Sequence, residues 1–170
     1  MNERFDDVVR NAFDFLGRSI DELQKHPKYS VIHFYSAIEL FAKARLLKEH
    51  WSLIVAKPEQ ADKAAFQRGD FQSVGLKDAN DRLTKIVGDG LLAEEYKHFD
   101  GLRKERNQMV HFSHAAQGDG EEAAKEMDRI VSDHAEGWLY LRRLLAGRWL
   151  QHFATYADTI KAMDGRMREQ

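Results

Sequence analysis

The sequence contains no cysteine and only 2 prolines among its 170 residues. The absence of cysteine excludes disulfide bonds, thiolate metal sites and a cysteine nucleophile, and it accords with a reducing compartment. Long apolar runs are also missing: stretches such as WSLIVA, which begins at Trp51, are far too short to cross a bilayer. The amino terminus is charged and carries no apolar signal segment. We therefore expect a cytoplasmic protein with no membrane partner.

A large excess of charge of one sign is absent as well. The formal net charge is −2, so a nucleic-acid partner would have to bind a local basic patch rather than a basic molecule. The composition, with 43% hydrophobic and 32% charged residues, is that of a soluble globular protein. The length fits one domain over residues 1–170. The helical pattern continues into the last residues, as it would in one domain of a longer protein.

Apolar residues recur at three- and four-residue spacing through most of the chain, which predicts helices. The predicted ranges are 3–25, 30–51, 78–87, 91–113 and 121 almost to the end. Apolar positions almost encircle the second range, so we expect it to be the most buried element. The last range contains Gly137 and Gly147, where it can kink. No strand alternation persists anywhere, so the predicted fold class is all-α, an up-down helical bundle.

Residues 55–77, between the second and third predicted helices, interrupt this periodicity. They contain Pro58, Gly69 and Gly75, with one short helical turn expected around 61–66. A structureless loop of this length is unusual inside a compact domain, and its apolar side chains need somewhere to pack. We therefore expect a structured insertion at this point.

Arg106 occupies an unusual place in the fourth predicted helix. It follows Phe99 by seven residues and precedes Val110 by four, so it lies within the apolar stripe. One interpretation is a snorkelling arginine whose head reaches solvent or a carboxylate. The candidate carboxylates are Glu39, Asp100 and Glu105.

Two neighbouring polar residues favour a site over a surface ion pair. At about 100° per residue, His111 lies about 140° around the helix from Arg106. Asn107 precedes His111 by four residues, so these two share a face. A helix bundle does not need an arginine, an amide and an imidazole beside its core. His111 and His114 are spaced to chelate a metal, but no third ligand stands at a helpful spacing, so we expect no metal and no cofactor.

The stretch RNQMVH, residues 106–111, resembles the motif of the HEPN domain (higher eukaryotes and prokaryotes nucleotide-binding). In that family an Arg is followed, after four to six residues, by a His on a late helix of a small bundle, and an Asn, Asp or His commonly follows the Arg. The stretch YSAIELFAKARLL resembles the family's early helix, in which a Glu and a Lys recur, here Glu39 and Lys43. The helix order resembles the family over most of the chain, whereas residues 55–77 have no counterpart in a minimal HEPN core.

The resemblance implies a metal-independent endoribonuclease of a toxin or defence system. Active HEPN domains form homodimers in which two copies of the motif face one cleft. The residue types suit this chemistry: Arg106 would hold the phosphate, and His111 would transfer protons. Asn107 would orient the imidazole or bind phosphate.

Substrate-binding roles are predicted for four further residues, Arg103, Lys104, His114 and Glu39. Arg103 and Lys104 share the helix with Arg106 and could guide a phosphate backbone, but interleaved acidic residues also fit an ordinary charged face. His114 fits a helix end or a cleft rim. By spacing alone, Glu39 and Lys43 fit a solvated ion pair on a helix surface.

Two function classes stay open at this point. The first is a ribonuclease, with RNA as substrate and, in a toxin system, an antitoxin or other regulatory protein as partner. The second is a non-catalytic HEPN module that binds a nucleotide, RNA or a partner protein. Retention of Arg, Asn and His together favours the first, because a binding module would need the Arg but not the His. A third class is a structural bundle in which the motif is accidental.

Overall fold

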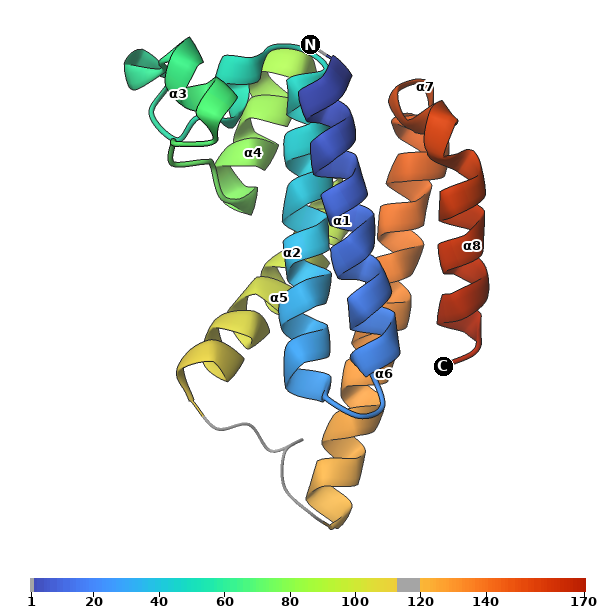
Figure 1. The fold of residues 1–170 in the computed structure, drawn as a ribbon. Helices are drawn as coiled ribbons and strands as arrows, with labels where there is room; N and C mark the ends of the chain where they lie inside the picture. Colours follow the sequence, from blue (N-terminus) through green and yellow to red (C-terminus); the bar gives the residue numbers. More distant parts are fainter. Residues whose placement is uncertain (1, 113–119) are drawn as a thin grey trace.

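The computed structural model describes residues 2–112 and 120–170, and this part of the chain is helical (Figure 1). It contains no strand, only one isolated antiparallel bridge between Val55 and Ser73. The predicted all-α fold class is therefore confirmed. No helix in the two described ranges is long and apolar enough to cross a membrane.

The helices follow the predicted order but differ in their bounds. They are α1 Asn2–Glu22, α2 Pro27–Leu47, the 3₁₀ turns η1 Trp51–Ile54 and η2 Pro58–Gln60, α3 Lys63–Arg68, α4 Leu76–Arg82, the π-helical turn η3 Leu83–Val87, α5 Ala93–His111, α6 Glu121–Arg143, the π-helical turn η5 Leu144–Arg148, α7 Leu150–Phe153, the 3₁₀ turn η6 Ala154–Tyr156 and α8 Ala157–Arg168. Helix α2 begins earlier than predicted, at Pro27. Proline suits the first position of a helix, where its missing N–H has no helical partner to lose.

Helix α2 is largely enclosed, as its encircling apolar pattern predicted. It contacts α1, α4, α5 and α6, and most of its residues are buried. Figure 1 shows α1 beside α2, while α5 crosses α2 obliquely. Because α2 is enclosed, three of its polar side chains, those of Ser30, Lys43 and Arg45, are buried.

The carboxy-terminal stretch is almost entirely helical, as predicted, but it forms a hairpin rather than one kinked helix, and Gly147, one of the two predicted kink positions, lies in η5, where the chain begins to turn. Helix α6 ends at Arg143, and η5, α7 and η6 reverse the chain so that α8 lies against α6 and α1 (Figure 1). The reversal buries Trp149 and Phe153, whose rings pack against each other. Phe153 also contacts Phe5 of α1. A straight helix would have carried these rings away from α1.

Gly137 marks a close approach between α6 and α2 and does not interrupt α6. A Cβ atom added there would stand 2.6 Å from Cε1 of the fully buried Phe34. Overpacking of this kind costs about 1–3 kcal/mol, whereas alanine gains about 1 kcal/mol in helix propensity over glycine.

We therefore expect Gly137→Ala to lower the free energy of unfolding by up to about 2 kcal/mol, measured by urea denaturation. Gly101→Ala in α5 is the matched control, because a Cβ there meets no heavy atom within 4 Å. It should raise stability by up to about 1 kcal/mol. Equal effects of the two substitutions would contradict the close packing at Gly137.

Residues 55–77 form a folded segment against the bundle. Phe66, Val74 and Leu76 are buried. Arg82 of α4 fixes the start of the segment by donating hydrogen bonds to three backbone carbonyl oxygens, those of Leu53, Val55 and Ala56. The end of the segment, residues 73–77, reaches the space between α2 and α5.

Candidate functional site

A groove between α2 and α5 brings together part of the predicted site. Its volume is about 570 Å³. The lining residues are Tyr35, Glu39, Gly75, Leu76, Lys77, Tyr96, Asp100, Arg103, Arg106 and Asn107. Four residues singled out from the sequence, Glu39, Arg103, Arg106 and Asn107, therefore share this α2–α5 groove.

Arg106 contributes an unneutralised cation to the groove. Its side chain is partly buried, and its Nε atom is buried without a hydrogen-bond partner. One terminal nitrogen, Nη1, donates to Oδ1 of Asn107 at 2.9 Å. No carboxylate in residues 2–112 or 120–170 forms an ion pair with it. The Asn107 amide thus holds one edge of the guanidinium in place without cancelling its charge.

The three carboxylates that could neutralise Arg106 each bind a different cation. The pairs are Glu39 with Lys43, Asp100 with Arg103 and Lys104, and Glu105 with Arg129. Hydrogen bonds from Lys104 and Arg103 lower the pKa of Asp100, so this carboxylate stays ionised at neutral pH. None of the three supplies the ion pair that a purely structural snorkelling arginine would use. Arg106 can therefore bind an external anion.

The Glu39–Lys43 pair is partly buried, so its interpretation as a solvated helix pair was wrong. Lys43 is only 8% exposed, and its Nζ donates to Glu39 at 2.7 Å and to Ser73 Oγ at 3.0 Å. The hydroxyl of Tyr35 donates to the other carboxylate oxygen at 3.2 Å. Burial, and after it the charge of Glu39, raises the pKa of Tyr35. The hydroxyl therefore stays protonated and remains a donor to Glu39.

His111 is not among the residues that line this groove. It is the last residue of α5 and is exposed, five residues beyond Arg106, or about 7.5 Å along the helix axis. No group in the described part of the chain hydrogen bonds to its ring, which contacts Phe112. Val110 and Phe112, on either side of it, are 43% and 70% exposed. His114, the other predicted histidine, lies outside the described residues.

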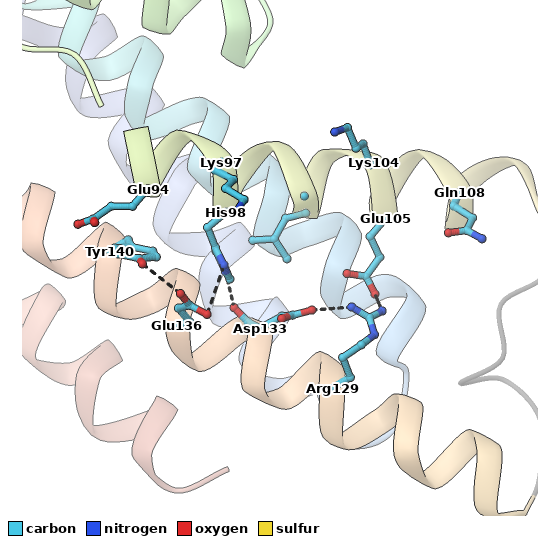
Figure 2. Close-up of a pocket in the computed structure, with 12 residues that line it drawn as sticks. Glu94, Lys97, His98, Lys104, Glu105, Gln108, Arg129, Asp133, Glu136 and Tyr140 are labelled. Carbon is cyan, nitrogen blue, oxygen red and sulfur yellow. Dashed lines mark hydrogen bonds and ion pairs between the residues drawn. The ribbon is translucent and has the colours of Figure 1, made fainter. Parts of the chain in front are cut away.

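Lys104 lines a different pocket, between α5 and α6, with a volume of about 670 Å³ (Figure 2). The Lys104 side chain points away from α6 in Figure 2. The central cation of this pocket, Arg129, binds three carboxylates, those of Glu105, Glu126 and Asp133. Nearby, His98 and Tyr140 both interact with Glu136. The three carboxylates neutralise Arg129, so the ion pairs of this larger pocket link α5 to α6 rather than offer a free cation to a ligand. The candidate site is therefore the smaller groove.

Four groove residues were not predicted from the sequence: Tyr35, Gly75, Lys77 and Tyr96. Two of them carried a signal, because Tyr35 precedes Glu39 by four residues and Tyr96 precedes Arg103 by seven, which places each pair on one helix face. Gly75 and Lys77 carried none, because they reach the groove only through the folding of residues 55–77.

No group of three or more His, Cys, Asp or Glu side chains within the described residues is arranged to hold a metal ion. No protein-family model, curated protein or solved structure matches this chain. The HEPN resemblance therefore stays a prediction that depends on the motif and the order of helices.

Proposed function

We propose that this chain is a metal-independent endoribonuclease of the HEPN type, acting as a homodimer. The observation that carries the proposal is Arg106, a partly buried cation that no described carboxylate neutralises. It stands beside Asn107 and five residues before an exposed imidazole, that of His111. A role in a toxin or defence system, with an antitoxin or other regulatory protein as partner, is part of the proposal and depends on the family resemblance alone.

The charge of the groove suits a phosphate backbone. Three cations line it, against two carboxylates. The cations are Lys77, Arg103 and Arg106, and the carboxylates are Glu39 and Asp100. This local positive excess occurs on a chain whose formal net charge is −2. RNA would therefore be attracted to this groove rather than to the molecule as a whole.

The chemistry needs no group from outside the protein and the RNA. A neutral imidazole takes the proton of the ribose 2′-hydroxyl, and the 2′-oxygen attacks the adjacent phosphorus. The bond from phosphorus to the 5′-oxygen breaks, and an imidazolium gives its proton to that oxygen. The products are a 2′,3′-cyclic phosphate and a 5′-hydroxyl end. Arg106 stabilises the charge that develops on the phosphoryl oxygens.

Two imidazoles act in this scheme, one as base and one as acid, whereas each chain contributes one His111. A second copy of the chain supplies the other. Val110 and Phe112 favour such an arrangement, because they expose apolar surface on both sides of His111. The proposed two-fold axis therefore passes near the carboxy-terminal end of α5, where a residue faces its own copy.

We expect Val110→Asp to convert the dimer into a monomer and to abolish cleavage, because paired carboxylates near a two-fold axis repel each other. Analytical ultracentrifugation at micromolar concentration measures the change. Leu139→Asp is the matched control: Leu139 lies on α6 and is 42% exposed, against 43% for Val110. It should leave the dimer intact. A wild-type protein that is strictly monomeric would contradict the composite site.

The proposal as a whole is tested by cleavage of single-stranded RNA in excess EDTA. Wild-type protein should cleave in chelator, and the double variant Arg106→Ala/His111→Ala, purified in parallel, should not. An additional preparation carrying Arg18→Ala and His26→Ala, two exposed positions that do not line the groove, should keep full activity. Activity that vanishes with EDTA and returns with a divalent cation would show that the chemistry is wrong.

One observation favours the second candidate, a non-catalytic RNA-binding module. A catalytic histidine is usually oriented by a hydrogen bond to its other ring nitrogen, and no described group makes one to His111. RNA binding that requires Arg106, combined with no cleavage by any preparation, would decide for this alternative.

A further inference from the structure

The α2–α5 groove contains acidic side chains that phosphate binding does not explain. Beyond Arg103 and Arg106 it contains two carboxylates. That of Asp100 pairs with Arg103 and Lys104, whereas that of Glu39 is flanked by Tyr35 and by the backbone of Gly75. A carboxylate repels phosphate, so a groove that bound only the RNA backbone would be expected to lack it. Glu39 therefore needs its own explanation.

Glu39 is built as a hydrogen-bond acceptor rather than as a free negative charge. Lys43 binds one oxygen at 2.7 Å and cancels its charge, and the protonated Tyr35 hydroxyl binds the other at 3.2 Å. Ser73 holds Lys43 from the opposite side, at 3.0 Å. These contacts fix the carboxylate, which is 25% exposed toward the groove. Each carboxylate oxygen accepts more than one hydrogen bond, so both can still accept from a ligand.

We propose that the groove binds a guanine base, with the two oxygens of Glu39 accepting hydrogen bonds from its N1–H and N2–H groups. The inference extends the proposed function, because it assigns a base preference to the same RNA site. In this arrangement the base lies between Glu39 and Tyr96 while Arg103 and Arg106 hold a neighbouring phosphate.

The pattern of hydrogen-bond donors and acceptors on the four bases favours guanine. Proteins that read single-stranded RNA commonly bind the Watson–Crick edge of an unstacked base. Guanine presents two adjacent N–H donors on that edge, which match the two oxygens of a carboxylate. Adenine and cytosine each place a ring-nitrogen acceptor beside their amino group, and uracil places its single N–H between two carbonyl oxygens. A carboxylate repels those acceptors, so only guanine forms two hydrogen bonds without a repulsive contact.

The walls of the groove leave space for a base. Gly75 has no side chain, and a Cβ added there would point at Glu39, 4.0 Å from its Oε2. The backbone of Gly75 is extended, with φ −84° and ψ 176°, so space rather than backbone conformation distinguishes glycine here. Tyr96 is partly exposed and offers a ring face on which a base can stack. The volume of about 570 Å³ lies within the usual range for a small-molecule site.

The test measures binding of the four nucleoside monophosphates, GMP, AMP, CMP and UMP, by isothermal titration calorimetry. Monophosphates contain no internucleotide bond, so the full wild-type chain can be used without turnover. We expect GMP to bind roughly tenfold or more tightly than the others, because a good bidentate base contact discriminates by about that factor. Glu39→Gln, which replaces one acceptor by a donor, should bring GMP to the level of the other nucleotides.

Glu39→Gln also removes the charge that pairs with the partly buried Lys43, and this loss could itself destabilise the fold. A second variant therefore tests the site without changing Glu39. Gly75→Leu fills the groove beside Glu39 while leaving Glu39 and Lys43 themselves unchanged, and it should abolish GMP binding. Gly101→Leu, at an open position on α5, is its matched control and should bind GMP normally. Thermal melting of all variants checks that they are folded.

The outcomes separate this inference from the proposed function. Equal binding of the four nucleotides, or binding of none, overturns the guanine site, and RNA cleavage that requires Arg106 and His111 would then still support the ribonuclease. Selective GMP binding that both groove variants abolish supports the guanine site even where no RNA is cleaved. Selective GMP binding that survives Gly75→Leu overturns it, because the base would then bind elsewhere.

Discussion

His111→Ala should abolish RNA cleavage while leaving RNA binding nearly unchanged, whereas Arg106→Ala should lose both. A neutral imidazole adds little to affinity for a polyanion, but proton transfer by a positioned side chain is worth a factor on the order of 10²–10⁴ in rate. Arg106 lies in the groove itself, and a charge-assisted contact from a guanidinium to phosphate contributes to binding and catalysis together. Because His111 is exposed and lies outside the groove, its removal should change the cleavage rate without changing RNA affinity.

Arg106→Lys distinguishes the planar guanidinium from a simple positive charge. An ammonium group restores the charge but cannot reproduce two parallel hydrogen bonds to a phosphate. We therefore expect Arg106→Lys to recover part of the RNA affinity and little of the cleavage rate. Fluorescence anisotropy with labelled RNA measures the first, and single-turnover cleavage measures the second.

Stability is the control that separates a functional Arg106 from a structural one. Its buried Nε has no partner, and an unsatisfied buried polar group costs about 1–3 kcal/mol. Arg106→Ala should therefore leave the melting temperature unchanged or raise it. A sharp fall in melting temperature, together with normal cleavage by His111→Ala, would mean that Arg106 is structural and that the enzyme proposal is wrong.

Acidification should produce the second large effect, through His134. This histidine is fully buried, with its ring stacked on Phe34 at a centroid distance of 4.6 Å. Nδ1–H donates to the Ile130 carbonyl at 2.9 Å, and Nε2 lies 3.0 Å from the Ser30 hydroxyl. Burial is the main reason that the pKa of His134 falls from 6.5 to about 4, and hydrogen bonding to the backbone of Ile130 and Ser30 opposes this shift only in part.

The direction of the pH dependence follows from this lowered pKa. Above pH 6.5 the imidazole is neutral in both the folded and the unfolded chain, and it adds no pH dependence. As the pH falls below 6.5, the unfolded chain binds a proton that the folded chain does not bind until about pH 4. Acid thus favours unfolding, and His134 should remove about 2 kcal/mol of stability by pH 5 and about 3 kcal/mol by pH 4.

Urea denaturation at pH 7 and pH 5 measures the contribution of His134. His134→Asn should be less stable than wild type at pH 7, because packing against Phe34 is lost, but its stability should change less between the two pH values. The expected difference in the pH-dependent change is about 2 kcal/mol. His26→Ala, at an exposed position, should keep the wild-type change. Identical changes in wild type and His134→Asn would contradict the lowered pKa.

Side-chain periodicity predicted the elements that depend on local spacing. A three- and four-residue apolar repeat identifies which face of a helix is buried, whatever that face packs against. It therefore predicted the burial of α2. The same repeat identified Arg106 as a cation within an apolar stripe, and Arg106 is partly buried in the structure.

Periodicity failed where a contact joins residues that are distant in the chain. The spacing of Glu39 and Lys43 is that of an ordinary surface pair, but Lys43 is buried and also donates a hydrogen bond to Ser73, 30 residues further along the chain. The reversal after Arg143 has a similar cause. Local spacing continues helically through Trp149 and Phe153, and only their packing in the core, with Phe153 against Phe5 of α1, requires the chain to turn back.

By itself, then, the sequence determined the fold class, the central helix and the motif RNQMVH, because each is a pattern within a short stretch of chain. The tertiary structure alone decided which carboxylates bind which cations, and therefore that none of the described carboxylates neutralises Arg106. It also decided that the groove includes Gly75 and Tyr35 and leaves out His111. Charge pairing and cavity shape depend on which side chains meet in space, and the order of residues along one helix does not specify that.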